Sequence, residues 1–134
     1  MRYMLDTNIC IYTIKRKPEQ VFRHLQGLKP EQICISAVTY AELMHGVEKS
    51  REKDRNRLAL TLLLSHIEIL AFDDTAAQEY GRIRAELEIN GTPIGPLDMM
   101  IAGHAVSRGC MLVTNNEKEF ERVRGLPLEN WAAE

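Results

Sequence analysis

Three acidic residues stand where a short apolar run gives way to the start of a helix. Asp6 directly follows the run Tyr3-Met4-Leu5, Glu42 lies a few residues beyond a second run, and Asp98 follows a proline, Pro96, that opens a helix. Carboxylates brought together repel one another unless a cation joins them. An all-oxygen site of this kind suits Mg²⁺ or Mn²⁺ better than zinc.

The expected position of these acids is one end of a parallel sheet. In open α/β sheets the ligand lies outside the carboxyl ends of the strands, so Asp6 faces the predicted site. Asp98 falls in the first turn of its helix, where the helix dipole favours a negative charge by roughly 0.3–1 kcal/mol. Glu42 lies about one turn into its own helix. Water bound to a metal there has a lowered pKa and can attack phosphorus, so the predicted chemistry is phosphodiester hydrolysis.

Each acid also has a simpler interpretation when it is taken alone. Asp6 can cap the helix that begins near Asn8, Asp98 can be a favourable first-turn acid, and Glu42 can be an exposed helical residue. Their shared position at one end of the sheet favours a functional site over these three separate structural roles.

The elements that must position the acids alternate between strand and helix, which predicts a mostly parallel sheet with right-handed crossovers and helices on both faces. The predicted strands span residues 3–5, 32–36, 67–72 and 111–113, with a fifth, edge strand at 126–131. The predicted helices span 8–15, 18–26, 39–49, 58–66, 74–89, 96–107 and 117–122, with a charged connection at 49–57.

Length and composition indicate one domain over residues 1–134, because a chain of 134 residues with 45% hydrophobic residues suffices for one core and leaves no room for a second. The formal net charge of −2 rules out a broadly basic coat for nucleic acid, although a metal and a local basic patch can still hold a phosphate backbone. Charge alone therefore neither supports nor excludes an RNA substrate.

The three cysteines are widely separated and have apolar neighbours, which is typical of buried small hydrophobic residues rather than a disulfide framework or zinc site. They are Cys10, Cys34 and Cys110. Asp6 interrupts the N-terminus before any apolar stretch of useful length, and no stretch approaches a membrane span. These features predict a cytoplasmic, reduced protein without a membrane partner.

Four blocks of sequence together carry a resemblance to a known family. They are Leu5-Asp6-Thr7-Asn8, Ile35 to Leu43 with Gly46, Ile94 to Ala102, and Val113-Thr114-Asn115-Asn116 with Phe120. In this order they resemble a PIN domain of the VapC toxin family, over nearly the whole chain. The resemblance implies a Mg²⁺-dependent endoribonuclease that acts on tRNA or other structured RNA, forms a homodimer and is inhibited by a VapB-like antitoxin.

The same resemblance assigns roles to individual residues. Asp6, Glu42 and Asp98 match the acids of the family's catalytic site, and Asp6 and Asp98 are the expected metal ligands. Many relatives carry an aspartate where this chain has Asn116, so Glu119 is the best substitute for a fourth catalytic acid. An amide adds no charge, which leaves both one and two metal ions open.

Other classes of protein fit the sequence less well. A receiver domain needs a lysine after a late strand, where this chain has Asn115, and an Asp-x-Asp phosphatase needs a second acid where it has Asn8. A degenerate PIN-like binding module without catalysis remains the alternative. Asn116, which stands where an acid is expected, is the feature that favours it. Metal-dependent cleavage of RNA discriminates between that module and an enzyme.

Overall fold

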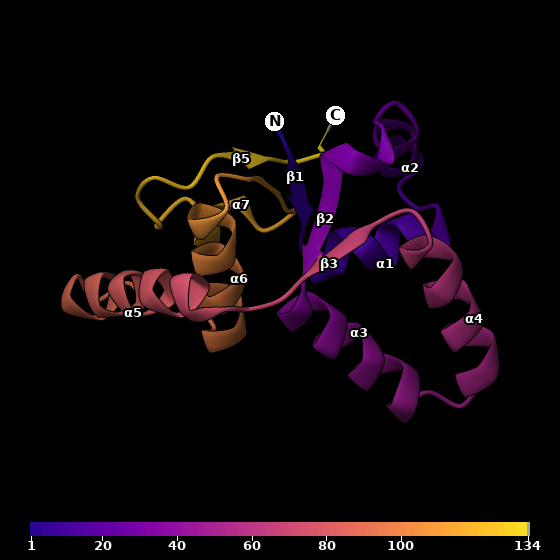
Figure 1. The fold of residues 1–134 in the computed structure, drawn as a ribbon, viewed down its shortest axis with the longest axis horizontal. Coiled ribbons are helices and arrows are strands. Elements are labelled where there is room, and N and C mark those ends of the chain that lie inside the picture. The colour runs from indigo at the N-terminus through magenta and orange to yellow at the C-terminus, as the bar shows by residue number, and fades with distance from the viewer. Residues whose placement is uncertain (134) are drawn as a thin grey trace.

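Five short parallel strands form the centre of the computed structural model, which describes residues 1–133 (Figure 1). The strands are β1 (Tyr3–Leu5), β2 (Ile33–Ser36), β3 (Glu68–Leu70), β4 (Met111–Val113) and β5 (Leu128–Glu129). The helices are α1 (Thr7–Lys15), α2 (Glu19–Gln26), α3 (Ala37–Lys49), α4 (Lys53–Leu64), α5 (Asp74–Ile89), α6 (Pro96–Ser107) and α7 (Glu117–Phe120), with a 3₁₀ turn at Pro30–Gln32.

The order of strands across the sheet is β3-β2-β1-β4-β5, and every neighbouring pair is parallel. The chain therefore builds one half of the sheet outward from β1 through β2 and β3, then returns to add β4 and β5 on the other side. The reversal falls between β1 and β4, where Leu5 pairs with Val113. In open α/β sheets such a switch point, at the carboxyl ends of the strands, is the usual place for a ligand.

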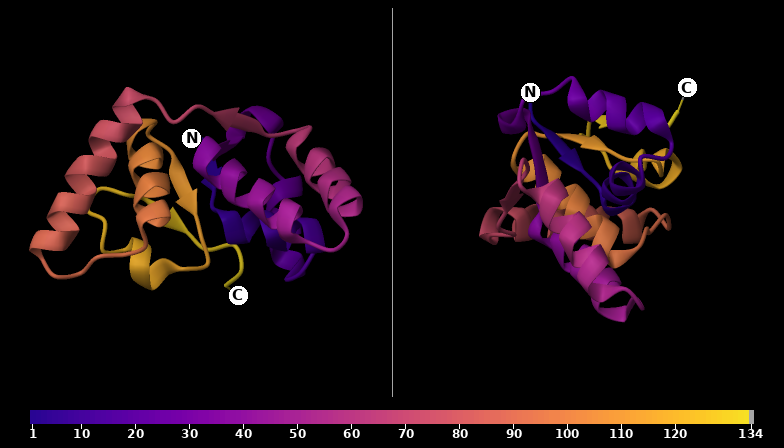
Figure 2. Two further views of the ribbon diagram at one scale, coloured as in Figure 1. Left: turned by 90° about the horizontal axis from the view of Figure 1, so that it is seen from below. Right: turned by 90° about the vertical axis from the view of Figure 1, so that its right-hand side faces the viewer.

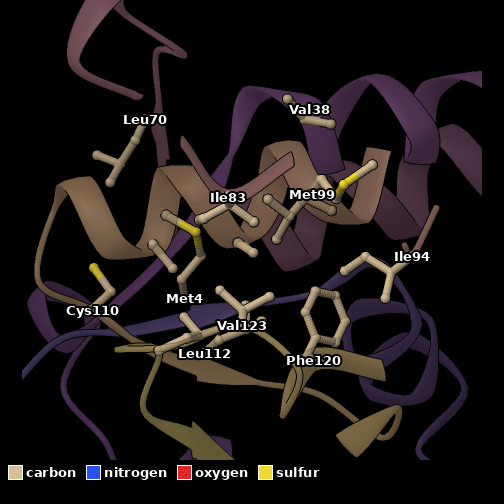
Figure 3. Packing of buried hydrophobic residues seen from close by; sticks show 14 of the residues in the cluster. Met4, Val38, Leu70, Ile83, Ile94, Met99, Cys110, Leu112, Phe120 and Val123 are labelled. Atoms are coloured by element: carbon tan, nitrogen blue, oxygen red, sulfur yellow. The ribbon is translucent and has the colours of Figure 1, made fainter. Parts of the chain in front are cut away.

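Successive side chains of each strand point to opposite faces of the sheet, where they contribute to two separate hydrophobic cores. Met4, Cys34 and Leu112 point toward α5, α6 and α7, where Figure 3 shows Met4 and Leu112 packed with Ile83, Met99 and Phe120. Leu5, Ile35 and Val113 belong to the opposite core, which α1, α2 and α4 cover. Helices lie on both sides of the sheet, as Figure 2 shows from two further directions. The central strands β1, β2 and β4 are therefore mostly buried on both faces, which explains why their residues form continuous apolar runs.

Helices α5 and α6 approach one another unusually closely. A Cβ built on Gly103 of α6 would lie 2.7 Å from the backbone nitrogen of Tyr80 and 2.9 Å from its Cα atom. Only glycine permits this backbone contact. The crossing fixes α6, whose first turn carries Asp98, against the long helix α5.

Several boundaries differ from the sequence-based prediction. Helix α3 begins at Ala37 rather than 39, because the Ser36 hydroxyl caps it by accepting a hydrogen bond of 3.0 Å from the Val38 amide. Helix α4 begins at Lys53 rather than 58. The charged segment taken as a connection is composed of good helix formers, and an ion pair between Arg57 and Glu48 (2.9 Å) ties it back to α3.

The edge strands are shorter than predicted. β3 covers Glu68–Leu70 instead of 67–72, and β5 covers Leu128–Glu129 instead of 126–131. Each has a single neighbour in the sheet, so only the residues that find backbone partners there are held as strand. A hydropathy pattern indicates which residues are buried, but it does not show that an edge strand has no neighbouring strand on its outer side.

The expectation for the cysteines is confirmed, because all three are buried and free of disulfides. Trp131 is also buried, and it stacks on His24 with ring centroids 5.2 Å apart. The helices α3 and α4 pack against one another. Along residues 1–133, no helix combines the length and the apolar content that crossing a membrane requires.

Candidate active site

Asp6 leaves the sheet directly after β1, at the switch point of the strand order. Its backbone amide donates to the Val113 carbonyl of β4 (3.0 Å), and its carboxylate caps α1 by accepting from the Ile9 amide (2.9 Å). Only 5% of Asp6 is exposed. A cap residue thus sits almost wholly inside the protein, at the end of the sheet where a ligand is expected.

Burial is the main reason why the pKa of Asp6 is raised from 3.8 to about 6. The hydrogen bonds that it accepts from Thr114 and Ile9 oppose the rise, and the negative charges of Asp98 and Glu42 add to it. The carboxylate is still mainly ionised at pH 7. Its unfavourable environment would be relieved by a bound cation or by protonation.

Asp98 lies in the first turn of α6 and faces the same group of acids. Its pKa is raised first by burial and then by the charges of Glu42 and Glu119. Since such charge effects require proximity, three elements, α3, α6 and α7, each bring one carboxylate to this place.

Two of the acids are held by a polar neighbour. Thr7, the first residue of α1, donates a hydrogen bond of 2.7 Å from Oγ1 to Glu42 Oε1. On the other side, Asn116 Nδ2 donates to Glu119 Oε2 at 2.9 Å, while the Asn116 backbone amide donates to Thr114 Oγ1, also at 2.9 Å. These bonds restrain the side chains of Glu42 and Glu119 at the edge of the group.

The structure thus brings together the four acids that the sequence singled out, Asp6, Glu42, Asp98 and Glu119. Sequence reasoning missed the contributions of Thr7 and Thr114, the hydroxyl residues beside the ends of β1 and β4. The signal available for them was a threonine within two residues of the end of a strand, next to a candidate acid or amide.

Other polar residues lie on the surface around the acids. His45, one turn after Glu42, is exposed on α3, and the basic residues of the segment 49–57 are spread over the turn before α4 and its solvent-facing side. The Tyr12 hydroxyl accepts a hydrogen bond of 3.1 Å from Asn115 Nδ2, just beyond β4.

The donor atoms of the acid group are all oxygens, and they carry an excess of negative charge. Within residues 1–133, no three His, Cys, Asp or Glu side chains stand close enough to form a finished ligand cluster. The donor chemistry nevertheless fits a hard divalent cation, which would offset the burial and the repulsion that raise the pKa of Asp6 and Asp98.

A parallel sheet with one buried acid and three half-buried acids at its switch point defines a site suited to hydrolysis at phosphorus. The model of the PIN domain matches residues 3–126, and the chain belongs to the PIN family, among its VapC ribonucleases. It is 52% identical over 132 residues to the tRNA(fMet)-specific endonuclease VapC of Shigella flexneri, covering 98% of this chain and 99% of that one. It is 46% identical to ribonuclease VapC2 of Rickettsia felis, covering 98% of each chain.

Solved structures agree with this assignment. A chain in the crystal structure of VapBC2 from Rickettsia felis bound to promoter DNA has a TM-score of 0.92 and 44% identity, covering 98% of this chain and 99% of that chain. A chain of the DNA-bound VapBC from Salmonella typhimurium has a TM-score of 0.91 and 50% identity, with 98% of each covered. Nucleases with a PIN domain generally depend on a divalent metal.

Proposed function

We propose that this protein is a Mg²⁺-dependent endoribonuclease and the toxin of a VapBC-type toxin–antitoxin pair. The observation that carries the proposal is the group of acids around the buried Asp6 at the switch point, in a chain so similar to named VapC endonucleases. We take the functional unit to be the single domain 1–134. Its free buried cysteines and its RNA substrate favour the cytoplasm.

In this proposal Asp6 and Asp98 hold the metal, and Glu42 and Glu119 complete the charge of the site. A cation held there would supply an activated water and would neutralise charge on the phosphate. Thr7 keeps Glu42 oriented, and burial of Asp6 excludes bulk water from its side of the site. Mg²⁺ is favoured because every available donor is a hard oxygen, and Mn²⁺ should substitute for it.

The proposed substrate is tRNA, and initiator tRNA in the first instance. Two relatives, from Shigella flexneri at 52% identity and from Salmonella typhimurium at 50%, are named tRNA(fMet)-specific endonucleases. The basic run Lys15-Arg16-Lys17 at the end of α1, which starts beside Asp6, is a candidate contact for the RNA backbone.

The proposed partners are a second copy of the chain and a VapB-like antitoxin. Similar chains are found in VapBC complexes from Rickettsia felis and Salmonella typhimurium. We expect a homodimer in solution and, in the complex, a basic antitoxin side chain near the acids, where it would compete with the metal for their charge.

The central test is cleavage of purified initiator tRNA with Mg²⁺ and with chelator, using the wild type, Asp6→Asn and Asp98→Asn. Both variants should remain folded and lose cleavage, because each removes a proposed metal ligand. Sequencing of RNA 5′ ends after brief expression would identify the substrate and the cleavage position. A folded variant that cleaves at the wild-type rate would contradict the assigned site, and an inactive wild type would favour a binding module.

A further inference from the structure

A buried polar link joins the two helices that carry Glu42 and Asp98. His104 on α6 and Ser36 at the start of α3 are both fully buried, and the His104 Nδ1 atom lies 2.7 Å from Ser36 Oγ. Neither residue belongs to the acid group. The contact is the shortest hydrogen bond between buried side chains of different elements among the described residues.

The serine hydroxyl makes two hydrogen bonds. Ser36 Oγ accepts from the Val38 amide, and its second hydrogen bond, to His104 Nδ1, can form with either tautomer of a neutral imidazole. Burial lowers the pKa of His104, as does the charge of Arg108, and these effects outweigh Asp73 and the Ala71 carbonyl, which act in the opposite direction.

The remaining surroundings hold the ring in place without binding it tightly. The edge of the ring packs against Phe72 with centroids 5.4 Å apart, in the segment after β3. Nε2 lies near the Ala71 carbonyl, but it makes no hydrogen bond of good geometry. The bond to Ser36 is therefore the directional contact that fixes the imidazole.

The hydrogen bond and the acids lie at two places along α3 and α6. Ser36, which ends β2 and caps α3, precedes Glu42 by six residues, and His104 on α6 follows Asp98 by six residues. The two helices contact each other, and the charge of Glu42 reaches Asp98. The bond thus fixes the start of α3 against α6 within two turns of both carboxylates.

We propose that His104 is a positioning residue, which sets the spacing of Glu42 and Asp98 through its hydrogen bond to Ser36. The inference rests on the proposed function, in which these acids form a metal-dependent site. Leucine could fill the space of the ring but makes no hydrogen bond to Ser36, whereas the amide of asparagine can donate or accept a hydrogen bond near the position of Nδ1.

The first measurement is the affinity of the metal-free protein for Mn²⁺, monitored by electron paramagnetic resonance. The second is kcat and KM for RNA cleavage at saturating Mg²⁺. His104→Leu should raise the Mn²⁺ dissociation constant about tenfold and lower kcat, with KM for RNA unchanged. His104→Asn should restore most of the affinity. Ile101→Val, a buried change on the same helix, is the control for a purely structural effect and should bind Mn²⁺ like the wild type.

Should His104→Leu unfold, Ser36→Ala removes the same hydrogen bond from the other side and should weaken Mn²⁺ binding in the same way. Equal Mn²⁺ affinity in the wild type and in a folded His104→Leu or Ser36→Ala variant would overturn this inference alone. Equal weakening in Ile101→Val would also overturn it. A wild type that binds no Mn²⁺ would overturn the inference and the proposed metal site together.

Discussion

Asn116 and Glu119 are joined by a hydrogen bond of 2.9 Å from Nδ2 to Oε2, across the first turn of α7. The amide thus orients an acid one turn later along α7. The charge of Glu119 in turn contributes to the raised pKa of Asp98, after burial and Glu42. Asn116, Glu119 and Asp98 are therefore parts of the same local arrangement.

The first prediction compares these two residues. Glu119→Gln should impair cleavage strongly, because it removes a negative charge from the site, whereas Asn116→Ala should impair it only moderately, by freeing the Glu119 side chain. Kinetics of both variants across a Mg²⁺ titration would check this. If Glu119→Gln retains the wild-type rate and Mg²⁺ dependence, the acidic site consists of Asp6, Glu42 and Asp98 alone.

A second prediction concerns the cost of burying Asp6. Asp6→Asn should stabilise the metal-free protein by about 1–3 kcal/mol at pH 7, because it removes a buried charge while its side-chain oxygen can still accept from the Ile9 amide. The melting temperature in chelator should rise by roughly 5 °C. A lower melting temperature would show that the carboxylate is favourably paired in the native state.

The pH dependence of stability supplies a third prediction. The pKa of Asp6 is 3.8 in the unfolded reference and about 6 in the native state, so between these values the native state binds more protons. This group therefore destabilises the protein fully above pH 6, and the loss is recovered as the pH falls toward 4. The raised pKa of Asp98 acts in the same direction.

Urea unfolding in chelator from pH 4.5 to pH 7.5 would measure this effect. The difference in unfolding free energy between Asp6→Asn and the wild type isolates the contribution of Asp6, and it should grow with pH. A difference that does not change over this range would mean that Asp6 titrates near its ordinary pKa.

The fourth prediction tests the restraint on Glu42. Thr7→Val removes the hydroxyl that donates to Glu42 Oε1 and should lower kcat about tenfold, whereas Thr7→Ser keeps the donor and should remain close to the wild type. Single-turnover cleavage of tRNA by the two variants would measure it. Similar losses in both would indicate that the methyl group, rather than the hydroxyl, is what matters.

The fifth prediction concerns the crossing of α5 and α6. Gly103→Ala would force a methyl group against the Tyr80 backbone and should destabilise the protein by about 2–3 kcal/mol. Gly81→Ala is the matched control, because a Cβ there meets nothing within 4 Å, and in a helix interior it should stabilise by about 0.5–1 kcal/mol. Thermal unfolding of the two variants decides the matter, and a stable Gly103→Ala would mean that the helices can separate.

The sequence by itself determined the elements and the chemistry of this protein. Apolar runs that are buried on both faces identify parallel strands, and Asp6 and Asp98 are recognisable because each stands at the boundary of an element. The family resemblance rests on the same local blocks. Local signals were least informative where neighbours decide the outcome, as at the edge strands β3 and β5 and at the charged start of α4.

Only the tertiary structure decided how the acids relate to one another. Thr7 and Glu42 are 35 residues apart in sequence, and Ser36 and His104 are 68 residues apart, yet each pair forms a hydrogen bond. Strand order and helix crossing bring these residues together, and no local sequence pattern encodes either of them. The raised pKa of Asp6 likewise depends on how deeply β1 and β4 bury it. Burial and electrostatic coupling are properties of the assembled fold, because they arise from residues that are remote in sequence and adjacent in space.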